Sequence, residues 1–515
     1  MFLRRKYLIS TASSVSARAK HSKDHWSMKD KKIFPKHRAL EHFDDFYKSV
    51  FGDKWPSIRV ALLSPQKYVA LVNNFGDTEK TCEKLENLGG INLRTLYNIQ
   101  KEKFLMKKQK KQRDKQLDKI YKMDQSLENF LMKQRQDEVS SVYGTNANEI
   151  SSIPESINNT KEPTTDISSA SNTEDSISTN DEGSSLSLHA RLKHAKYDER
   201  RLINPEVGLA ALHEFIPATK LKGIEDWVFE SEHYQYYQNP SEFPIKVEAE
   251  APFTIPETFN VYSYERGNIS DFPSPKRGST GVFSHYLMNG GSILPVLALD
   301  LQAGDRVLDA CAAPGGKSLL MLQTLLPGLV ISNDIQESRI NRLKSVFDQY
   351  LYDYGTKWKG LSYITKQDAR ALMEYDSYDK VLVDVPCTTD RHSVNNDDNN
   401  IFKPTRIKER LRIPELQSQI LSNCLRLVKP GGTVVYSTCS LSPVQNDGVV
   451  HLALRQAFEN HNIEACIRNI SSAMVPFDHI FQFGYNMGLR YGQMVIPFLP
   501  SNFGPLYFSK IIRLK

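Results

Sequence analysis

Two cysteines and a glycine-rich loop are the residues of this chain best suited to chemistry. Cys387 stands in Asp-Val-Pro-Cys, Cys439 stands in Ser-Thr-Cys-Ser, and residues 309–317 read Asp-Ala-Cys-Ala-Ala-Pro-Gly-Gly-Lys. A thiolate is a strong nucleophile that can form a covalent intermediate with an unreactive carbon. Two thiols beside a loop able to hold a cofactor therefore point to methylation of cytosine at ring carbon 5.

Carbon 5 of cytosine is too poor a nucleophile to take a methyl group directly. Addition of a thiolate to carbon 6 turns the ring into an enamine, and carbon 5 then becomes nucleophilic. Asp384 lies three residues before Cys387, where its carboxyl can hydrogen-bond or protonate the ring during the attack. Packing is the usual role of a single buried cysteine, and we assign it to the other four, Cys82, Cys311, Cys424 and Cys466.

The glycine-rich loop follows an apolar segment that reads as a strand. Gly315 and Gly316 let the backbone approach a ligand, and Lys317 opens a helix whose free amides face the pocket. The spacing matches neither a Walker loop nor GxGxxG. Asp334, after the next strand, is placed to accept from ribose hydroxyls, and Asp368, after the third, from an adenine amino group. S-adenosylmethionine needs these features, although each acid taken alone also reads as a surface or helix-capping carboxylate.

Strand and helix patterns alternate from about residue 280. We predict strands over residues 306–309, 329–333, 361–365, 380–384, 433–437, 494–496 and 507–512. We predict helices between them, including residues 317–326, 338–350 and 414–428. This alternation predicts an α/β fold, a doubly wound, Rossmann-like and mainly parallel sheet, whose ligand sits beyond the carboxyl ends of the strands.

The three motifs resemble the signature of the Sun-domain RNA cytosine-5 methyltransferases. The resemblance implies that Cys439 is the nucleophile, that Cys387 assists product release, and that Asp384 takes part in catalysis. DNA cytosine methyltransferases use the cysteine of a Pro-Cys motif instead, so the order of the two thiols rests on the resemblance. It also implies S-adenosylmethionine as cofactor, no metal, and cofactor contacts from Gly315, Gly316, Lys317, Asp334, Arg339, Asp368, Ala369 and Asp384. For Arg339 a solvated helix position is the alternative.

A finer resemblance lies in the residues after Cys387. They read Thr-Thr-Asp-Arg-His-Ser, where most family members have a glycine- and arginine-rich stretch. This variant resembles the mitochondrial branch of the family, which methylates small-subunit ribosomal RNA. The likeness covers residues 36–98 and 263–515, and it implies a partner of the mitochondrial transcription-termination-factor family. No separate RNA-binding domain is evident, which favours such a docking partner.

Composition agrees with this interpretation. The chain has 515 residues, 40% of them apolar, and a formal charge of +6. A mild positive excess permits a nucleic-acid partner without demanding one. The cysteines show no paired spacing, so a reducing compartment is favoured over a disulfide framework or a zinc site. No apolar stretch has the length of a membrane span.

The amino-terminal residues are basic, rich in serine and free of acids up to Lys23. This composition is typical of a mitochondrial transit peptide, which we predict over residues 1–30, with the matrix as the destination. A basic tail that touches RNA has the same composition and is the alternative.

Five further segments follow from shifts in composition. We predict a mostly helical extension over residues 31–100 and a charged helix over residues 101–139. A solvated charged helix is favoured for the latter over a basic arm that faces RNA. Residues 140–189 are acidic and of low complexity, which predicts a disordered linker. Residues 190–262 read as an irregular connector, and residues 263–515 as the methyltransferase domain.

The sequence therefore predicts a mitochondrial enzyme that methylates a cytosine of small-subunit ribosomal RNA and supports mitoribosome assembly. A non-catalytic assembly factor is one alternative, and the same chemistry on mitochondrial transfer RNA is another. A basic cluster beyond Cys387 reads either as a phosphate contact or as a solvated helical face. It consists of Lys403, Arg406, Lys408, Arg410 and Arg412.

Overall fold

The computed structural model describes residues 34–143, 245–485 and 487–515. Of these, residues 34–109, 245–485 and 487–515 belong to one compact unit, and residues 110–143 belong to another. The predicted transit peptide, most of the predicted linker and much of the predicted connector lie outside the described residues.

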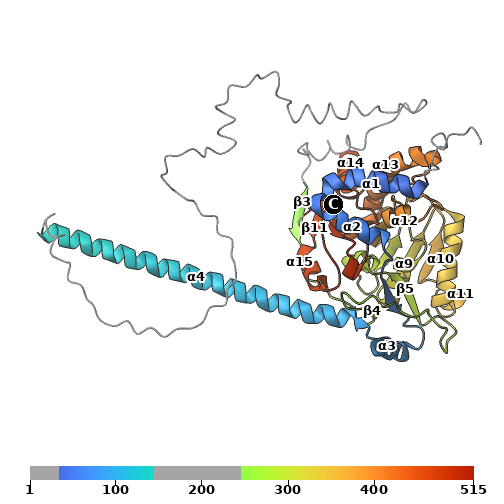
Figure 1. The fold of residues 1–515 in the computed structure, drawn as a ribbon, viewed down its shortest axis with the longest axis horizontal. Helices are drawn as coiled ribbons and strands as arrows, with labels where there is room; N and C mark the ends of the chain where they lie inside the picture. Colours follow the sequence, from blue (N-terminus) through green and yellow to red (C-terminus); the bar gives the residue numbers. More distant parts are fainter. Residues whose placement is uncertain (1–33, 144–244, 486) are drawn as a thin grey trace, which may run out of the picture. The chain divides into compact units, whose positions relative to one another are not determined.

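A mainly parallel nine-stranded sheet forms the centre of the first unit (Figure 1). Its order is β3-β11-β13-β10-β9-β6-β7-β8, with β12 paired to β13. The strands are β3 (Lys246–Ala249), β6 (Arg306–Asp309), β7 (Leu329–Asn333), β8 (Ser362–Thr365), β9 (Tyr378–Asp384), β10 (Val428–Thr438), β11 (Ala465–Asn469), β12 (Gln493–Val495) and β13 (Leu506–Arg513). The strand order reverses between β6 and β9, which creates the switch point where α/β sheets bind ligands. The predicted doubly wound fold is confirmed.

Helices cover both faces of this sheet because its central strands are apolar on both sides. Val381 and Val383 of β9 face one core, whereas Leu382 between them faces the other. The first core also takes side chains from α1 (Pro35–Phe51), α2 (Trp55–Leu63), α12 (Asp390–Asn395), α13 (Ile407–Leu427) and α14 (Val449–His461). The second takes side chains from α8 (Ile293–Ala298), α9 (Gly316–Gln323), α10 (Glu337–Tyr350), α11 (Tyr354–Lys357) and α15 (Ser471–Met474). In Figure 1, α1, α13 and α14 lie together.

A second, four-stranded sheet joins the amino-terminal region to the methyltransferase domain. Its order is β2-β4-β1-β5, with α3 (Thr78–Asn87) between β1 and β2. In β1, Ala70 pairs with Tyr262 on one side and Leu287 on the other. The strands are β1 (Tyr68–Val72), β2 (Ile91–Asn92), β4 (Val261–Ser263) and β5 (His285–Asn289). The extension predicted as mostly helical thus also supplies two strands, whose partners lie far along the chain.

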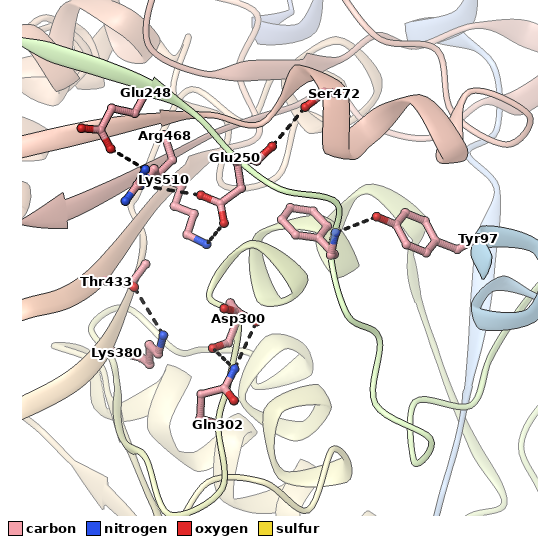
Figure 2. Close-up of polar contacts among 11 residues, drawn as sticks. Tyr97, Glu248, Glu250, Asp300, Gln302, Lys380, Thr433, Arg468, Ser472 and Lys510 are labelled. Carbon is pink, nitrogen blue, oxygen red and sulfur yellow. Dashed lines mark hydrogen bonds and ion pairs between the residues drawn. The ribbon is translucent and has the colours of Figure 1, made fainter. Parts of the chain in front are cut away.

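The edge strand β3 is fastened to the sheet by charge as well as by backbone pairing (Figure 2). Glu250 Oε1 lies 3.1 Å from Nζ of Lys510, a lysine that is only 2% exposed. Arg468 of β11 pairs with Glu248 at 2.5 Å, and Ser472 Oγ donates to the Glu250 carbonyl. A buried lysine needs such a partner, since an unpaired charge in the interior is costly. The described end of the predicted irregular connector is therefore ordered as strand.

Two predicted helices have different bounds in the structure, and a strand of the central sheet was not predicted. Helix α4 (Leu93–Tyr143) begins before residue 101 and continues past residue 139, so residues 140–143 are helix rather than linker. Helix α13 begins at Ile407, because the helix continues through Pro414 instead of starting there. Strand β11 was not predicted at all. Within the described ranges, no helix combines the length and the apolar character needed to cross a membrane.

Candidate functional site

A cavity of about 970 Å³ opens at the carboxyl ends of β6, β9 and β10. Five of the predicted site residues line it: Lys317, Arg339, Asp384, Cys387 and Cys439. The other predicted cofactor residues are absent from its lining: Gly315, Gly316, Asp334, Asp368 and Ala369. The structure thus brings together all three predicted catalytic side chains and only part of the predicted cofactor set.

The two thiols meet because β9 and β10 are parallel neighbours. Asp384 at the end of β9 is in register with Ser437 of β10, and each cysteine follows within three residues. The two Sγ atoms lie 3.0 Å apart. The hydrogen bond from Cys439 lowers the pKa of Cys387, whereas the bond to Cys387, burial and nearby negative charge raise the pKa of Cys439. The pair therefore favours one thiolate and opposes a second.

A partly buried ion pair lies beside the thiols. Lys317 Nζ is 2.6 Å from Asp384 Oδ2, and Ser437 Oγ donates to Oδ1 of the same carboxylate at 2.7 Å. Burial opposes the charge of Lys317, but the charge and hydrogen bond of Asp384 prevail, so the pKa of Lys317 is raised. Behind it, burial raises the pKa of Asp309 to about 7, and Ser318 Oγ donates to that carboxyl. Lysine 317 is thus held as a cation that fixes the Asp384 carboxylate in place.

The glycine loop is shaped by one left-handed residue. Gly315 has φ 109°, and a Cβ there would lie 2.6 Å from Leu343 Cδ1 of α10, so only glycine fits. The loop is tied to β7 by Ala313 N, which donates to Asp334 Oδ2 at 3.3 Å. Arg339 pairs with the same oxygen and donates to the Ala313 carbonyl at 2.7 Å. Asp334 and Arg339 therefore hold the loop, and Arg339 also lines the cavity.

Asp368 and Ala369 follow β8, as predicted, but they do not reach the cavity. The Asp368 carboxylate is occupied by Arg370, whose NH2 lies 2.6 Å from Oδ2, and Ala369 is buried in the core. Arg370 itself lines the cavity. The turn after β8 thus pairs Asp368 with Arg370 and leaves it out of the cavity lining. The position of Asp368 after a predicted strand does not reveal this pairing.

S-adenosylmethionine fits the donor chemistry of this cavity. The molecule carries a sulfonium, an ammonium and a carboxylate, and the cavity offers the carboxylate of Asp384 and the guanidinium of Arg339. Its wall includes Ala313 and Pro314, so the backbone of the predicted cofactor loop is open to a ligand. Methyl transfer from this cofactor is therefore compatible with the residues present.

Sequence reasoning missed the polar residues that support the thiol loops. Gln445 accepts from Thr388 N and donates to Thr388 Oγ1, both at 3.1 Å, and Gln417 donates to the Pro386 carbonyl at 2.8 Å. Gln445 lies in a π-helical turn, Val444–Gly448, a local irregularity common near functional sites. The sequence signal that could have identified Gln445 as a support residue is its position six residues after Cys439.

The predicted basic cluster is divided by the structure. Arg406 and Arg412 line the cavity, whereas Lys403, Lys408 and Arg410 are absent from its lining. The guanidinium of Arg410 lies over the ring of Phe402 at 4.6 Å. Two members of the cluster thus border the mouth of the site.

Comparison with known proteins gives consistent matches. The family described as 16S rRNA methyltransferase RsmB/F matches residues 296–480. The 5-cytosine rRNA methyltransferase nsun-4 of Caenorhabditis elegans is 35% identical over 492 residues, 93% of this chain and 92% of the relative. The 5-cytosine rRNA methyltransferase NSUN4 of Xenopus tropicalis is 32% identical over 505 residues, 98% of this chain and 97% of the relative. A mitochondrial tRNA (cytosine(34)-C(5))-methyltransferase of Danio rerio is 38% identical over 45% of this chain and 61% of its own length.

The thiol pair makes a prediction about ionisation. Cys439→Ala removes the hydrogen bond that lowers the pKa of Cys387, so Cys387 should ionise at higher pH in this variant. The measurement is the rate of iodoacetamide labelling of the Cys387 peptide against pH, followed by mass spectrometry. Cys439→Ser keeps a donor and should retain a midpoint close to that of the unaltered protein. Equal midpoints for Cys439→Ala and the unaltered protein would show that the thiols do not share a proton.

Proposed function

The chain belongs to the Sun-domain RNA cytosine-5 methyltransferase family, and on this premise we propose that it methylates mitochondrial small-subunit ribosomal RNA. The reaction transfers a methyl group from S-adenosylmethionine to carbon 5 of a cytosine through a covalent cysteine adduct. The observation that carries this proposal is the pair of thiols, 3.0 Å apart, in one cavity with Lys317 and Asp384.

The proposed mechanism divides the work between the thiols. The Cys439 thiolate forms a bond to carbon 6 of cytosine, the double bond between carbons 5 and 6 opens with its electron pair directed to carbon 5, and the Asp384 carboxylate hydrogen-bonds the ring. When bound, S-adenosylmethionine would supply the electrophilic methyl group that carbon 5 takes up and would leave as S-adenosylhomocysteine. A base then removes the proton on carbon 5, the bond between Sγ and carbon 6 breaks, and the thiolate leaves. Cys387, in contact with Cys439, assists this release.

The order of proton loss is compatible with this division of roles, which rests on the family resemblance. In the absence of RNA the negative charge of the pair is favoured on Cys387, because Cys439 donates the hydrogen bond. A proton that passes from Cys439 to Cys387 when cytosine enters leaves Cys439 as the attacking thiolate. On expulsion of the product the same proton returns to Cys439. In Cys387→Ala this proton goes to solvent instead, because the hydrogen bond and charge of Cys387 that raise the pKa of Cys439 are then absent.

Cofactor contacts follow from the residues near the loop. Lys317, Arg339 and Asp384 line the cavity directly. Gly315 and Gly316 shape the loop, and Asp334 orients it through Ala313. Asp368 and Ala369 complete the proposed set; Asp368 reaches the cofactor only if its pairing with Arg370 opens.

The proposal also covers the cellular compartment and the protein partner. The basic, acid-free amino terminus supports import into the mitochondrial matrix. One relative is named as a mitochondrial enzyme, which supports the same compartment. A docking partner from the mitochondrial transcription-termination-factor family and a role in mitoribosome assembly accompany this substrate by family resemblance.

The substrate is tested by bisulfite sequencing of mitochondrial RNA from cells with and without the protein. We expect one or more small-subunit ribosomal cytosines to lose protection when the protein is absent and to regain it on complementation. Unchanged ribosomal cytosines would overturn the proposed substrate. A change confined to transfer RNA would assign the same chemistry to that substrate.

Variants of the thiols test the mechanism. Cys439→Ala should reduce methylation below detection, because no sulfur then attacks carbon 6. Cys387→Ala should accumulate a covalent protein–RNA adduct, visible as a denaturant-resistant band on a gel. Cys82→Ala, a cysteine of α3 outside the cavity, is the control and should behave like the unaltered protein. Methylation by Cys439→Ala, or an adduct formed by that variant, would reverse or refute the roles.

The cavity mouth makes a prediction about RNA affinity. Arg412→Ala should weaken RNA binding and reduce the slope of log affinity against log salt by about 1, as loss of one phosphate contact does. Lys408→Ala removes one positive charge from the same helix, but Lys408 does not line the cavity. This variant should therefore change the slope less than Arg412→Ala does. Fluorescence anisotropy over a salt series measures both. Equal slopes for the two variants would place the phosphate contact elsewhere.

A further inference from the structure

We propose that Asp390 and Tyr47 form a positioning pair through which the amino-terminal helix α1 holds both thiol loops in their reactive geometry. Neither residue touches the cavity, and neither is assigned a chemical step. The inference rests on the proposed function only in so far as Cys387 and Cys439 are its reacting groups.

Asp390 is fully buried, at 0% exposure, and its carboxylate joins the two loops. From the Cys387 loop, Thr388 Oγ1 donates to Oδ1 at 2.5 Å. From the Cys439 loop, Leu441 N donates to Oδ2 at 2.7 Å and Ser440 Oγ donates to Oδ1 at 3.1 Å. One carboxylate thus contacts residues next to both cysteines.

The backbone of Asp390 adds a further link, since its N–H points to the carbonyl of Cys439 at 3.4 Å. Asp390 therefore bonds to Cys439 itself through its backbone, and through its carboxylate to residues that lie one or two positions after a reacting cysteine. The two Sγ atoms lie 3.0 Å apart, so a small displacement of either loop changes their contact substantially.

Tyr47 supplies the last donor and comes from a distant part of the chain. Its hydroxyl donates to Asp390 Oδ2 at 2.7 Å, and its side chain is 1% exposed. Burial raises the pKa of Asp390, while the hydrogen bonds of its donors oppose that rise. A buried carboxylate is costly unless its donors are in place, so the loop arrangement depends on Tyr47 as well as on the loops themselves.

The rest of α12 binds α2, whose Trp55 ring packs against Tyr47 of α1 with the ring centroids 5.3 Å apart. Arg391 NH1 donates to the carbonyls of Ala61 and Ser64 at the end of α2, at 2.9 and 2.8 Å. Asn395 donates to the carbonyl of Leu62 at 2.9 Å. Tyr47 is therefore presented to Asp390 by a docked helix pair, which excludes a loose, incidental contact. The amino-terminal helices act as a support for the catalytic loops.

The test is the single-turnover rate of methyl transfer to in-vitro-transcribed small-subunit ribosomal RNA, at saturating RNA and S-adenosylmethionine. Tyr47→Phe keeps the ring but removes the donor, and the rate should fall by about three- to tenfold. Asp390→Asn should lower it by about 10- to 100-fold, because an amide cannot accept from every donor. Dissociation constants for RNA and cofactor should stay within about twofold of those of the unaltered protein, because neither side chain lines the cavity.

The double variant Tyr47→Phe/Asp390→Asn should lose less than the product of the two single effects, since both substitutions break one shared hydrogen bond. Tyr97→Phe is the matched control. Its hydroxyl is equally buried and accepts from Phe253 N at 2.8 Å, away from the thiol loops (Figure 2). That variant should lose thermal stability but keep the saturated rate.

A saturated rate for Tyr47→Phe equal to that of Tyr97→Phe would overturn the positioning role. So would losses that appear only in the dissociation constants. If Asp390→Asn does not fold, the positioning role is decided by comparing the saturated rates of Tyr47→Phe and Tyr97→Phe. Failure of the proposed substrate is recognised separately, because the unaltered protein would then leave this RNA unmethylated.

Discussion

The parallel pairing of β9 and β10 is the constraint on which the site depends. Their register sets Asp384 opposite Ser437, so the chain leaves both strands at the same height and in the same direction. The two cysteine-bearing turns therefore start side by side, although 52 residues separate Cys387 from Cys439. A shift of register by one residue would turn these side chains to opposite faces and separate the thiols.

Lys317 is the cation of this cavity that pairs with Asp384. It lies in the first turn of α9, and the glycine loop before it places its ammonium against that carboxylate. Because the pair is largely removed from water, each member fixes the other and neither is free to move. The same loop is held by Asp334, which follows β7, and by Arg339 of α10. Lys317, Asp384 and both thiols line the same cavity.

The amino-terminal region belongs to the same body as the methyltransferase domain. Strand β1 completes a sheet with β4 and β5, and α1 packs its aromatic face on the core that also holds α13 and α14. Tyr47 of α1 also connects this region to the thiol loops through its hydrogen bond to Asp390. The segment after Cys387, which differs from that of most family members, supplies these contacts. Asp390 binds α1, and Arg391 and Asn395 bind α2.

Much of the site was readable in the sequence because its signals are local. The alternation of strands and helices specifies the sheet, and the spacing of Asp384, Cys387 and Cys439 after strand ends places them at one edge. The sequence missed β11 and the pairing of β1 with residues 261–289, since strand partners far apart leave no local pattern. It also read Pro414 as a helix start, a local rule that packing along α13 overrides.

Residue types and their order along the chain determined the fold class, the cofactor loop and the two thiols. Only the tertiary structure decided that Lys317 pairs with Asp384, that Arg370 occupies Asp368, and that the sulfurs touch. It alone joined Tyr47 to Asp390 across 343 positions. The physical reason is that side-chain contacts depend on distances between segments, and these distances are fixed by packing of the whole chain rather than by any local sequence.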